Sequence, residues 1–105
     1  MFQVTRFTLA ANNGEIGGGE VMLLRTAKVL RQLGHEVTVV APAIADGVGA
    51  AAAKAGFATV AIKGQGRKAY MRNLRAWDAS QRQGVLWCHG HVPALATVGH
   101  PQRIV

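Results

Sequence analysis

The sequence predicts an α/β fold of the Rossmann-like kind, in which helices cover both faces of a parallel sheet. Short apolar runs alternate along the chain with longer segments of helical periodicity. The connections between them are short, which favours right-handed strand–helix–strand crossovers and therefore a parallel sheet. With 105 residues and no linker-like segment, the chain is expected to form one domain over residues 1–105.

The first strand is expected at residues 2–10, whose Phe, Val, Leu and Thr residues favour β-structure. The segment 12–20 follows, Asn-Asn-Gly-Glu-Ile-Gly-Gly-Gly-Glu, with the composition of a strand-to-helix turn. Gly17, Gly18 and Gly19 allow backbone angles closed to other residues and bare amide groups at a helix N-terminus, where a phosphate or carboxylate is favoured. In the alternative interpretation they only permit a tight turn and close packing of the helix on the sheet.

A helix is expected at residues 20–33, where apolar residues from Val21 to Leu33 recur at three- and four-residue spacing and form one broad stripe. Glu20 places a carboxylate at the positive end of the helix dipole, and we assign it this role rather than that of a catalytic base. Gly34 stands where a left-handed C-terminal cap is usual.

The middle of the chain repeats this pattern. The apolar run at 37–41, closed by a proline, is typical of a buried parallel strand. An alanine-rich helix is expected at 46–56, with Asp46 as its N-cap and Gly56 at its end. A third strand is expected at 58–62.

The longest helix of the second half is expected at 67–83, followed by Gly84 as its cap. Tyr70, Leu74 and Trp77 share one face of this helix, and basic side chains cover the remainder. We interpret the apolar face as directed toward the core of the protein.

The last third supplies a strand at 85–88, a helix at 92–98 and the start of a further strand at 103–105. Cys88 is the chain's one cysteine and lies within an apolar run, so it is expected to be a buried small hydrophobe rather than a nucleophile. His89 follows at the carboxyl end of the fourth strand.

The composition limits the partners of the protein. A net charge of +7 favours something anionic, such as nucleic acid, acidic lipid headgroups or a phosphorylated substrate. No apolar run approaches the roughly 18 residues of a spanning helix, and a single cysteine fits a reducing compartment, so a cytoplasmic location is expected. No metal site is expected, because the pair His89-x-His91 has no carboxylate or cysteine companions, and His91 and His100 are interpreted as structural residues.

Two common phosphate-binding motifs are absent from the glycine turn. Its glycines do not occupy the first, third and sixth positions of a dinucleotide fingerprint, which disfavours a nicotinamide dehydrogenase. The turn is not followed by Gly-Lys-Ser/Thr, so it is not a P-loop.

Three segments in order match a different pattern: Gly-Gly-Gly-Glu at 17–20, Leu-Gly-His-Glu-Val-Thr-Val-Val-Ala-Pro at 33–42, and Val-Leu-Trp-Cys-His-Gly at 85–90. Together they resemble the N-terminal domain of retaining GT-B glycosyltransferases of the family 4-like type. Members of that family carry Gly-Gly-Ala-Glu, Gly-His-Glu-Val-Thr-Val and Val-Val-His-x-His at these places. His89 matches the second histidine of the last motif, whereas Trp87 replaces the first.

This resemblance implies a function and a site. It implies transfer of a glycosyl group from a nucleotide sugar to a glycan or lipid-linked acceptor, with the nucleotide sugar as substrate and no cofactor. It also implies that Gly17, Gly18 and Gly19 approach the donor phosphates or sugar, and that His89 faces the acceptor and the reacting centre. In the alternative interpretation, His89 only caps or packs at a strand end.

The resemblance further implies a second domain. In GT-B enzymes the second domain supplies most of the nucleotide pocket, including two glutamates separated by seven residues. The chain is therefore expected to be the acceptor-side piece of a longer or two-subunit enzyme, inactive without its partner domain.

The basic helix leaves three interpretations open: a solvated face, a peripheral contact with anionic membrane, or binding of nucleic acid. No nucleic-acid recognition motif accompanies the arginines, so nucleic acid is the least favoured partner. The rival function is accordingly a non-enzymatic, basic α/β module that binds nucleotides or nucleic acid. The residues assigned to a membrane contact are Arg67, Lys68, Arg72 and Arg75.

Overall fold

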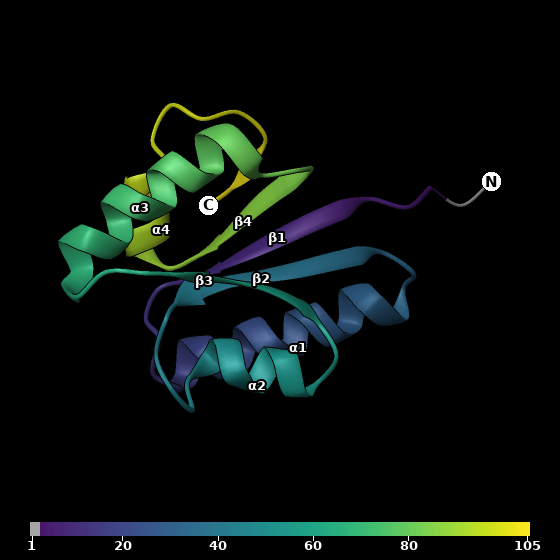
Figure 1. Cartoon of the computed structure of the whole chain (residues 1–105). Helices are drawn as coiled ribbons and strands as arrows, with labels where there is room; N and C mark the ends of the chain where they lie inside the picture. The colour runs from purple at the N-terminus through teal and green to yellow at the C-terminus, as the bar shows by residue number, and fades with distance from the viewer. Residues whose placement is uncertain (1–2) are drawn as a thin grey trace.

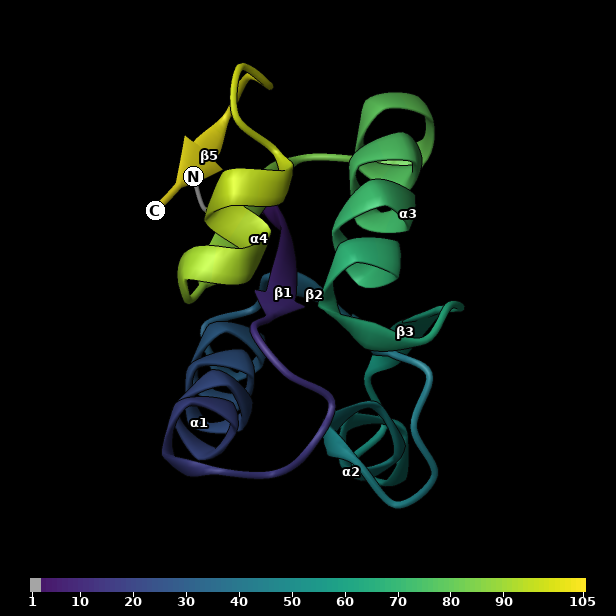
Figure 2. The ribbon, with the colours of Figure 1, turned by 90° about the vertical axis from the view of Figure 1, so that its left-hand side faces the viewer.

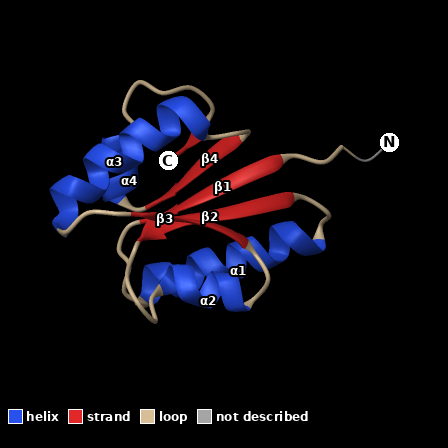
Figure 3. Cartoon of the chain, in the orientation of Figure 1, coloured by secondary structure: helices blue, strands red, loops and turns tan. Residues whose placement is uncertain are grey.

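The computed structural model describes residues 3–105 and shows a five-stranded parallel sheet between two layers of helices (Figures 1 and 3). The predicted Rossmann-like α/β fold is confirmed. In chain order the elements are β1 (Arg6–Ala11), α1 (Gly18–Gln32), β2 (Glu36–Pro42), α2 (Val48–Lys54), β3 (Ala58–Ile62), α3 (Gly66–Gln81), β4 (Val85–His89), α4 (His91–Ala96) and β5 (Arg103–Ile104).

The strand order is β3-β2-β1-β4-β5, so the direction in which the chain adds strands reverses at β1. On one side of β1, Ala10 pairs with Val40 of β2. On the other side, Ala11 pairs with His89 of β4. In an open parallel sheet, ligands bind outside the carboxyl ends of the strands at such a reversal.

The two helical layers divide the core between them (Figure 2). Alternate residues of a strand face opposite sides of the sheet. Leu9 accordingly packs with Leu23 in the layer of α1 and α2, whereas the adjacent Ala10 packs with Leu86 and Cys88 on the layer of α3 and α4.

The ends of the first two helices are as the sequence predicts. Gly34 follows α1 with φ of 92°, and Gly56 follows α2 with φ of 91°. Both values lie in the left-handed region, where a side chain would strain the backbone.

The prediction that Asp46 caps the second helix is wrong. Asp46 has φ of 58°, and the N-cap of α2 is Gly47. The main-chain oxygen of Gly14 accepts a hydrogen bond of 2.9 Å from the amide of Val48, so a backbone group from the glycine turn satisfies this helix end. A Cβ atom on Gly47 would lie 2.3 Å from the same oxygen, which explains why the chain passes this point at glycine.

Gly84 does not cap α3, contrary to the prediction. The helix ends at Gln81, and Gly84 lies beyond the C-cap residue Arg82. It has φ of 78°, and a Cβ there would lie 2.1 Å from the main-chain oxygen of Arg6. Close passage beside β1, rather than helix termination, therefore requires this glycine.

The first strand and helix differ from the prediction at their margins. β1 begins at Arg6, and Phe2 lies outside the described residues. The apolar stripe of α1 is narrower than predicted: Leu23 is buried, but Val21 and Leu33 are 40% and 57% exposed. Val21 lies two positions from Leu23, on another side of the helix, and Leu33 is already the C-cap.

Candidate functional site

The two groups that the sequence singles out lie at the same edge of the sheet. The glycine turn follows the carboxyl end of β1 and leads into α1, and His89 ends β4, the strand paired with β1. The first four strands are parallel, as this arrangement requires.

The glycine turn leaves the start of α1 sterically open. Gly17 is the N-cap residue with φ of −127°, and neither Gly18 nor Gly19 has a positive φ. The prediction that the three glycines supply unusual backbone angles is therefore wrong. A Cβ atom built on Gly18 or Gly19 would meet no other atom within 4 Å, so close packing of helix on sheet does not require them either.

Glu20 completes this helix end as predicted. It is 7% exposed, and its Oε1 atom accepts a hydrogen bond of 3.3 Å from the amide of Gly17. The amides of the first helical turn have no carbonyl partner within the helix. Those of Gly18 and Gly19 thus remain as donors at the positive end of the dipole, beside open space.

His89 is half-buried, and its ring stacks on Trp87 with centroids 5.5 Å apart. Its Nε2 atom is buried and has no hydrogen-bond partner among residues 3–105. Burial lowers the pKa of this imidazole, which favours the neutral form. A buried polar atom without a partner costs about 1–3 kcal/mol, so a hydrogen bond to this nitrogen would stabilise the protein.

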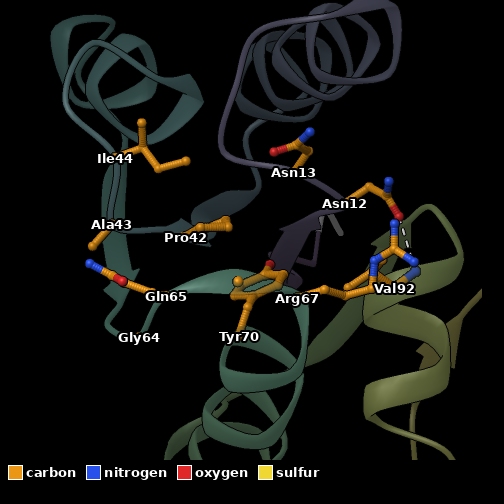
Figure 4. Close-up of a pocket in the computed structure, with 11 residues that line it drawn as sticks. Asn12, Asn13, Pro42, Ala43, Ile44, Gly64, Gln65, Arg67, Tyr70 and Val92 are labelled. Carbon is orange, nitrogen blue, oxygen red and sulfur yellow. Dashed lines mark hydrogen bonds between the residues drawn. The ribbon is translucent and has the colours of Figure 1, made fainter.

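Asn12 is a member of this edge that sequence reasoning missed. Its Oδ1 atom accepts a hydrogen bond of 3.0 Å from the amide of Val92, at the start of α4 (Figure 4). The contact links the loop after β1 to the start of α4. Gly90 has φ of 131°, and a Cβ there would lie 2.4 Å from the same oxygen. The only sequence feature that indicates a role for Asn12 is its position directly after a buried strand.

A pocket of about 440 Å³ opens at the carboxyl ends of β1, β2 and β3 (Figure 4). Arg67 is the one charged residue among those that line it. The hydroxyl of Tyr70, whose pKa is raised by burial, donates a hydrogen bond of 2.5 Å to the main-chain oxygen of Ala11 and so fixes α3 against the end of β1. The lining residues are Asn12, Asn13, Pro42, Ala43, Ile44, Gly64, Gln65, Gly66, Arg67, Tyr70 and Val92.

The pocket does not contain the residues predicted from the sequence. Gly17, Gly18, Gly19 and His89 are not among those that line it. The ring of His89 lies on Trp87, which packs against the core under α1 and α2. The edge thus carries two neighbouring features: the open start of α1 with His89, and the pocket between α3 and the loops after β1 and β2.

The basic helix α3 divides its cations between structure and surface. Arg75 donates hydrogen bonds to the main-chain oxygens of Ala96 and Val98, and Arg82 forms a buried ion pair with Asp78. Arg67, Lys68 and Arg72 are exposed and form no ion pair among residues 3–105. Tyr70 and Leu74 are buried, which confirms that the apolar face of this helix is directed toward the core. The buried cluster to which they belong consists of Val40, Ile62, Tyr70, Leu74, Val92 and Ala96.

Cys88 is a core residue, as predicted. It is 6% exposed, and its sulfur lies 3.8 Å from the hydroxyl of Thr97. Burial raises the pKa of the thiol, so the reactive thiolate is disfavoured.

Comparisons with known proteins leave the fold as the principal guide. No protein-family model, curated protein or solved structure matches the chain. Within residues 3–105, His, Cys, Asp and Glu side chains form no group of three that could hold a metal ion. Over the same residues, every helix is too short or too polar to cross a bilayer.

Proposed function

We propose that this chain is the acceptor-side domain of a sugar-nucleotide-dependent glycosyltransferase of the GT-B type, which works with a second, nucleotide-binding domain. The observation that carries the proposal is the open start of α1, which lies at the same edge of the sheet as His89, where the strand order reverses. Gly18 and Gly19 have neither a backbone nor a packing reason to be glycine within the fold. Close approach of a ligand to their amides is the reason that remains.

The chemistry of the two groups suits glycosyl transfer. In this reaction the bond between the anomeric carbon and the donor diphosphate breaks, and the diphosphate leaves with the electron pair. The acceptor hydroxyl forms the new bond to that carbon and releases its proton. Amides at the start of α1 would stabilise the charge that develops on the diphosphate, and the neutral imidazole of His89 would accept a hydrogen bond from a sugar hydroxyl.

The proposal is tested by titrating the ¹⁵N-labelled chain with UDP-glucose and GDP-mannose. We expect saturable shifts of the amides of Gly18 and Gly19 and of the ring protons of His89. His89→Ala should remove or weaken the response, and His91→Ala is the matched control because its side chain is exposed two residues away. Shifts spread evenly over the basic surface, or the same response in both variants, would contradict the proposal.

The rival function, a basic module that binds nucleic acid, is favoured by the net charge of +7. It predicts oligonucleotide affinity that falls steeply with salt concentration. Lys68 and Arg72 are the suitable positions for alanine variants, because both are exposed. Arg75 is unsuitable, since its guanidinium holds the end of α4 and its loss would also affect folding.

A further inference from the structure

The pocket beside α3 has a chemical character of its own. Apolar side chains supply part of its wall, from Pro42, Ile44 and Val92. Asn13 and Gln65 add side-chain amides, which donate and accept hydrogen bonds. A volume of about 440 Å³ lies within the range of pockets that hold small molecules.

The charge of this pocket has one sign. Arg67 is exposed, and no carboxylate among residues 3–105 pairs with it. No acidic residue lines the pocket. A guanidinium without a protein partner presents a planar set of donors that matches the oxygens of a phosphate or carboxylate.

The polar groups surround the pocket rather than gathering at one point. Figure 4 shows Arg67 and Tyr70 on the α3 side, and Asn13 and Ile44 on the side of the loops that follow β1 and β2. The hydroxyl of Tyr70 is already bonded to the main chain, and Oδ1 of Asn13 accepts a hydrogen bond from the amide of Glu15. Arg67, the side-chain amide of Gln65 and the NH₂ group of Asn13 are left for a ligand. One cationic group and several amides fit a ligand with one anionic group and several hydroxyls.

We propose that this pocket binds a phosphorylated sugar or polyol, and that this compound is the glycosyl acceptor. The assignment rests on the proposed function and deepens it, because it names the acceptor class. Arg67 holds the phosphate, and Asn13 and Gln65 form hydrogen bonds with hydroxyl groups. The acceptor would then lie at the same sheet edge as the open start of α1.

The test is a titration of the ¹⁵N-labelled chain with glucose 6-phosphate, and with glucose and inorganic phosphate as separate probes. We expect saturable shifts of the amides of Asn13, Ile44 and Arg67 with glucose 6-phosphate, and weaker binding of the other two. Arg67→Gln should raise the dissociation constant about tenfold through loss of a charge-assisted contact. Arg72→Gln, five positions further along the same helix, exposed and outside the pocket lining, should leave it unchanged.

Three results would overturn the assignment: equal affinity for inorganic phosphate and glucose 6-phosphate, an unchanged dissociation constant in Arg67→Gln, or shifts confined to the start of α1. A titration of Arg67→Gln with a nucleotide sugar tests the proposed function separately from the pocket. If the amides of Gly18 and Gly19 still respond there, the failure belongs to the pocket alone. If these amides respond in neither the wild type nor Arg67→Gln, the proposed function is contradicted as well.

Discussion

The side-chain oxygen of Asn12 accepts a hydrogen bond from the amide of Val92, a residue 80 positions further along the chain. The bond spans the point at which the strand order reverses, where β1 and β4 lie side by side. It satisfies a main-chain donor at the start of α4, a helix of six residues, and it joins the loop after β1 to that helix. Fold and site therefore share this contact.

Asn12→Ala should lower the free energy of unfolding by about 0.5–2 kcal/mol, the usual cost of removing a side-chain oxygen from a helix N-terminus. Asn12→Asp keeps the acceptor and should retain most of the stability. Urea denaturation followed by circular dichroism measures both variants. Equal losses in the two would show that the hydrogen bond is not the stabilising element.

Gly18→Ala and Gly19→Ala should each stabilise the fold and weaken ligand binding. Alanine is favoured over glycine in a helix by up to about 1 kcal/mol, and its Cβ meets no atom at either position, so thermal stability should rise. The same methyl groups would block approach to the amides and weaken nucleotide-sugar binding. The contrasting variant is Gly47→Ala, which should destabilise the fold because its Cβ would strike the oxygen of Gly14. Improved stability with unchanged binding would remove the glycine turn from the site.

The sequence predicts the architecture well because its signals are local. Apolar runs, helical spacing, and the glycines at 34 and 56 each reveal an element from its own residues, and β1 to β4 follow from them. The errors arise where a distant backbone decides the outcome. The carbonyl of Gly14 takes the capping role assigned to Asp46, and the backbone of Arg6 determines the place of Gly84.

The candidate site is less accessible from the sequence for the same reason. His89 and the glycine turn are visible as motifs beside predicted strand ends. The pocket is not, because Asn13, Ile44 and Arg67 come together only through the order of the strands. Arg82 is an example of a residue whose burial the sequence does not reveal. It follows a helix rich in exposed basic residues, yet its own side chain is 5% exposed.

Asp78→Asn should destabilise the protein strongly. Asp78 is fully buried, with one oxygen 2.8 Å from Nε of Arg82 and the other 2.5 Å from Nδ1 of His100. Loss of this carboxylate leaves the buried guanidinium without its counter-charge, which typically costs about 3–5 kcal/mol. Glu36→Gln is the matched control, because it breaks an exposed ion pair with Arg6 worth about 0–1 kcal/mol. Chemical denaturation at neutral pH compares the unfolding free energies of the two variants. Similar losses would contradict the conclusion that burial makes the ion pair of Asp78 more important than that of Glu36.

His89 should make the fold less stable as the solution becomes acidic. Burial places the pKa of the folded imidazole below its ordinary value of 6.5, so near that pH the unfolded chain binds more protons than the folded one. Stability from this residue is therefore fully present above pH 6.5, and it is lost as the pH falls from there through the folded pKa. His89→Gln removes the titrating group and should flatten this part of the dependence on pH.

The midpoint of the His89 ring-proton titration, followed by NMR, measures the folded pKa directly and should lie below 6.5. Urea denaturation of wild type and His89→Gln at several pH values then tests the linkage, because the difference in unfolding free energy between the two proteins should shrink or reverse on acidification. A midpoint above 6.5 would mean that the folded protein stabilises the imidazolium. A larger fraction of the rings would then be protonated near neutral pH, and a protonated ring cannot accept the proposed hydrogen bond from a sugar hydroxyl.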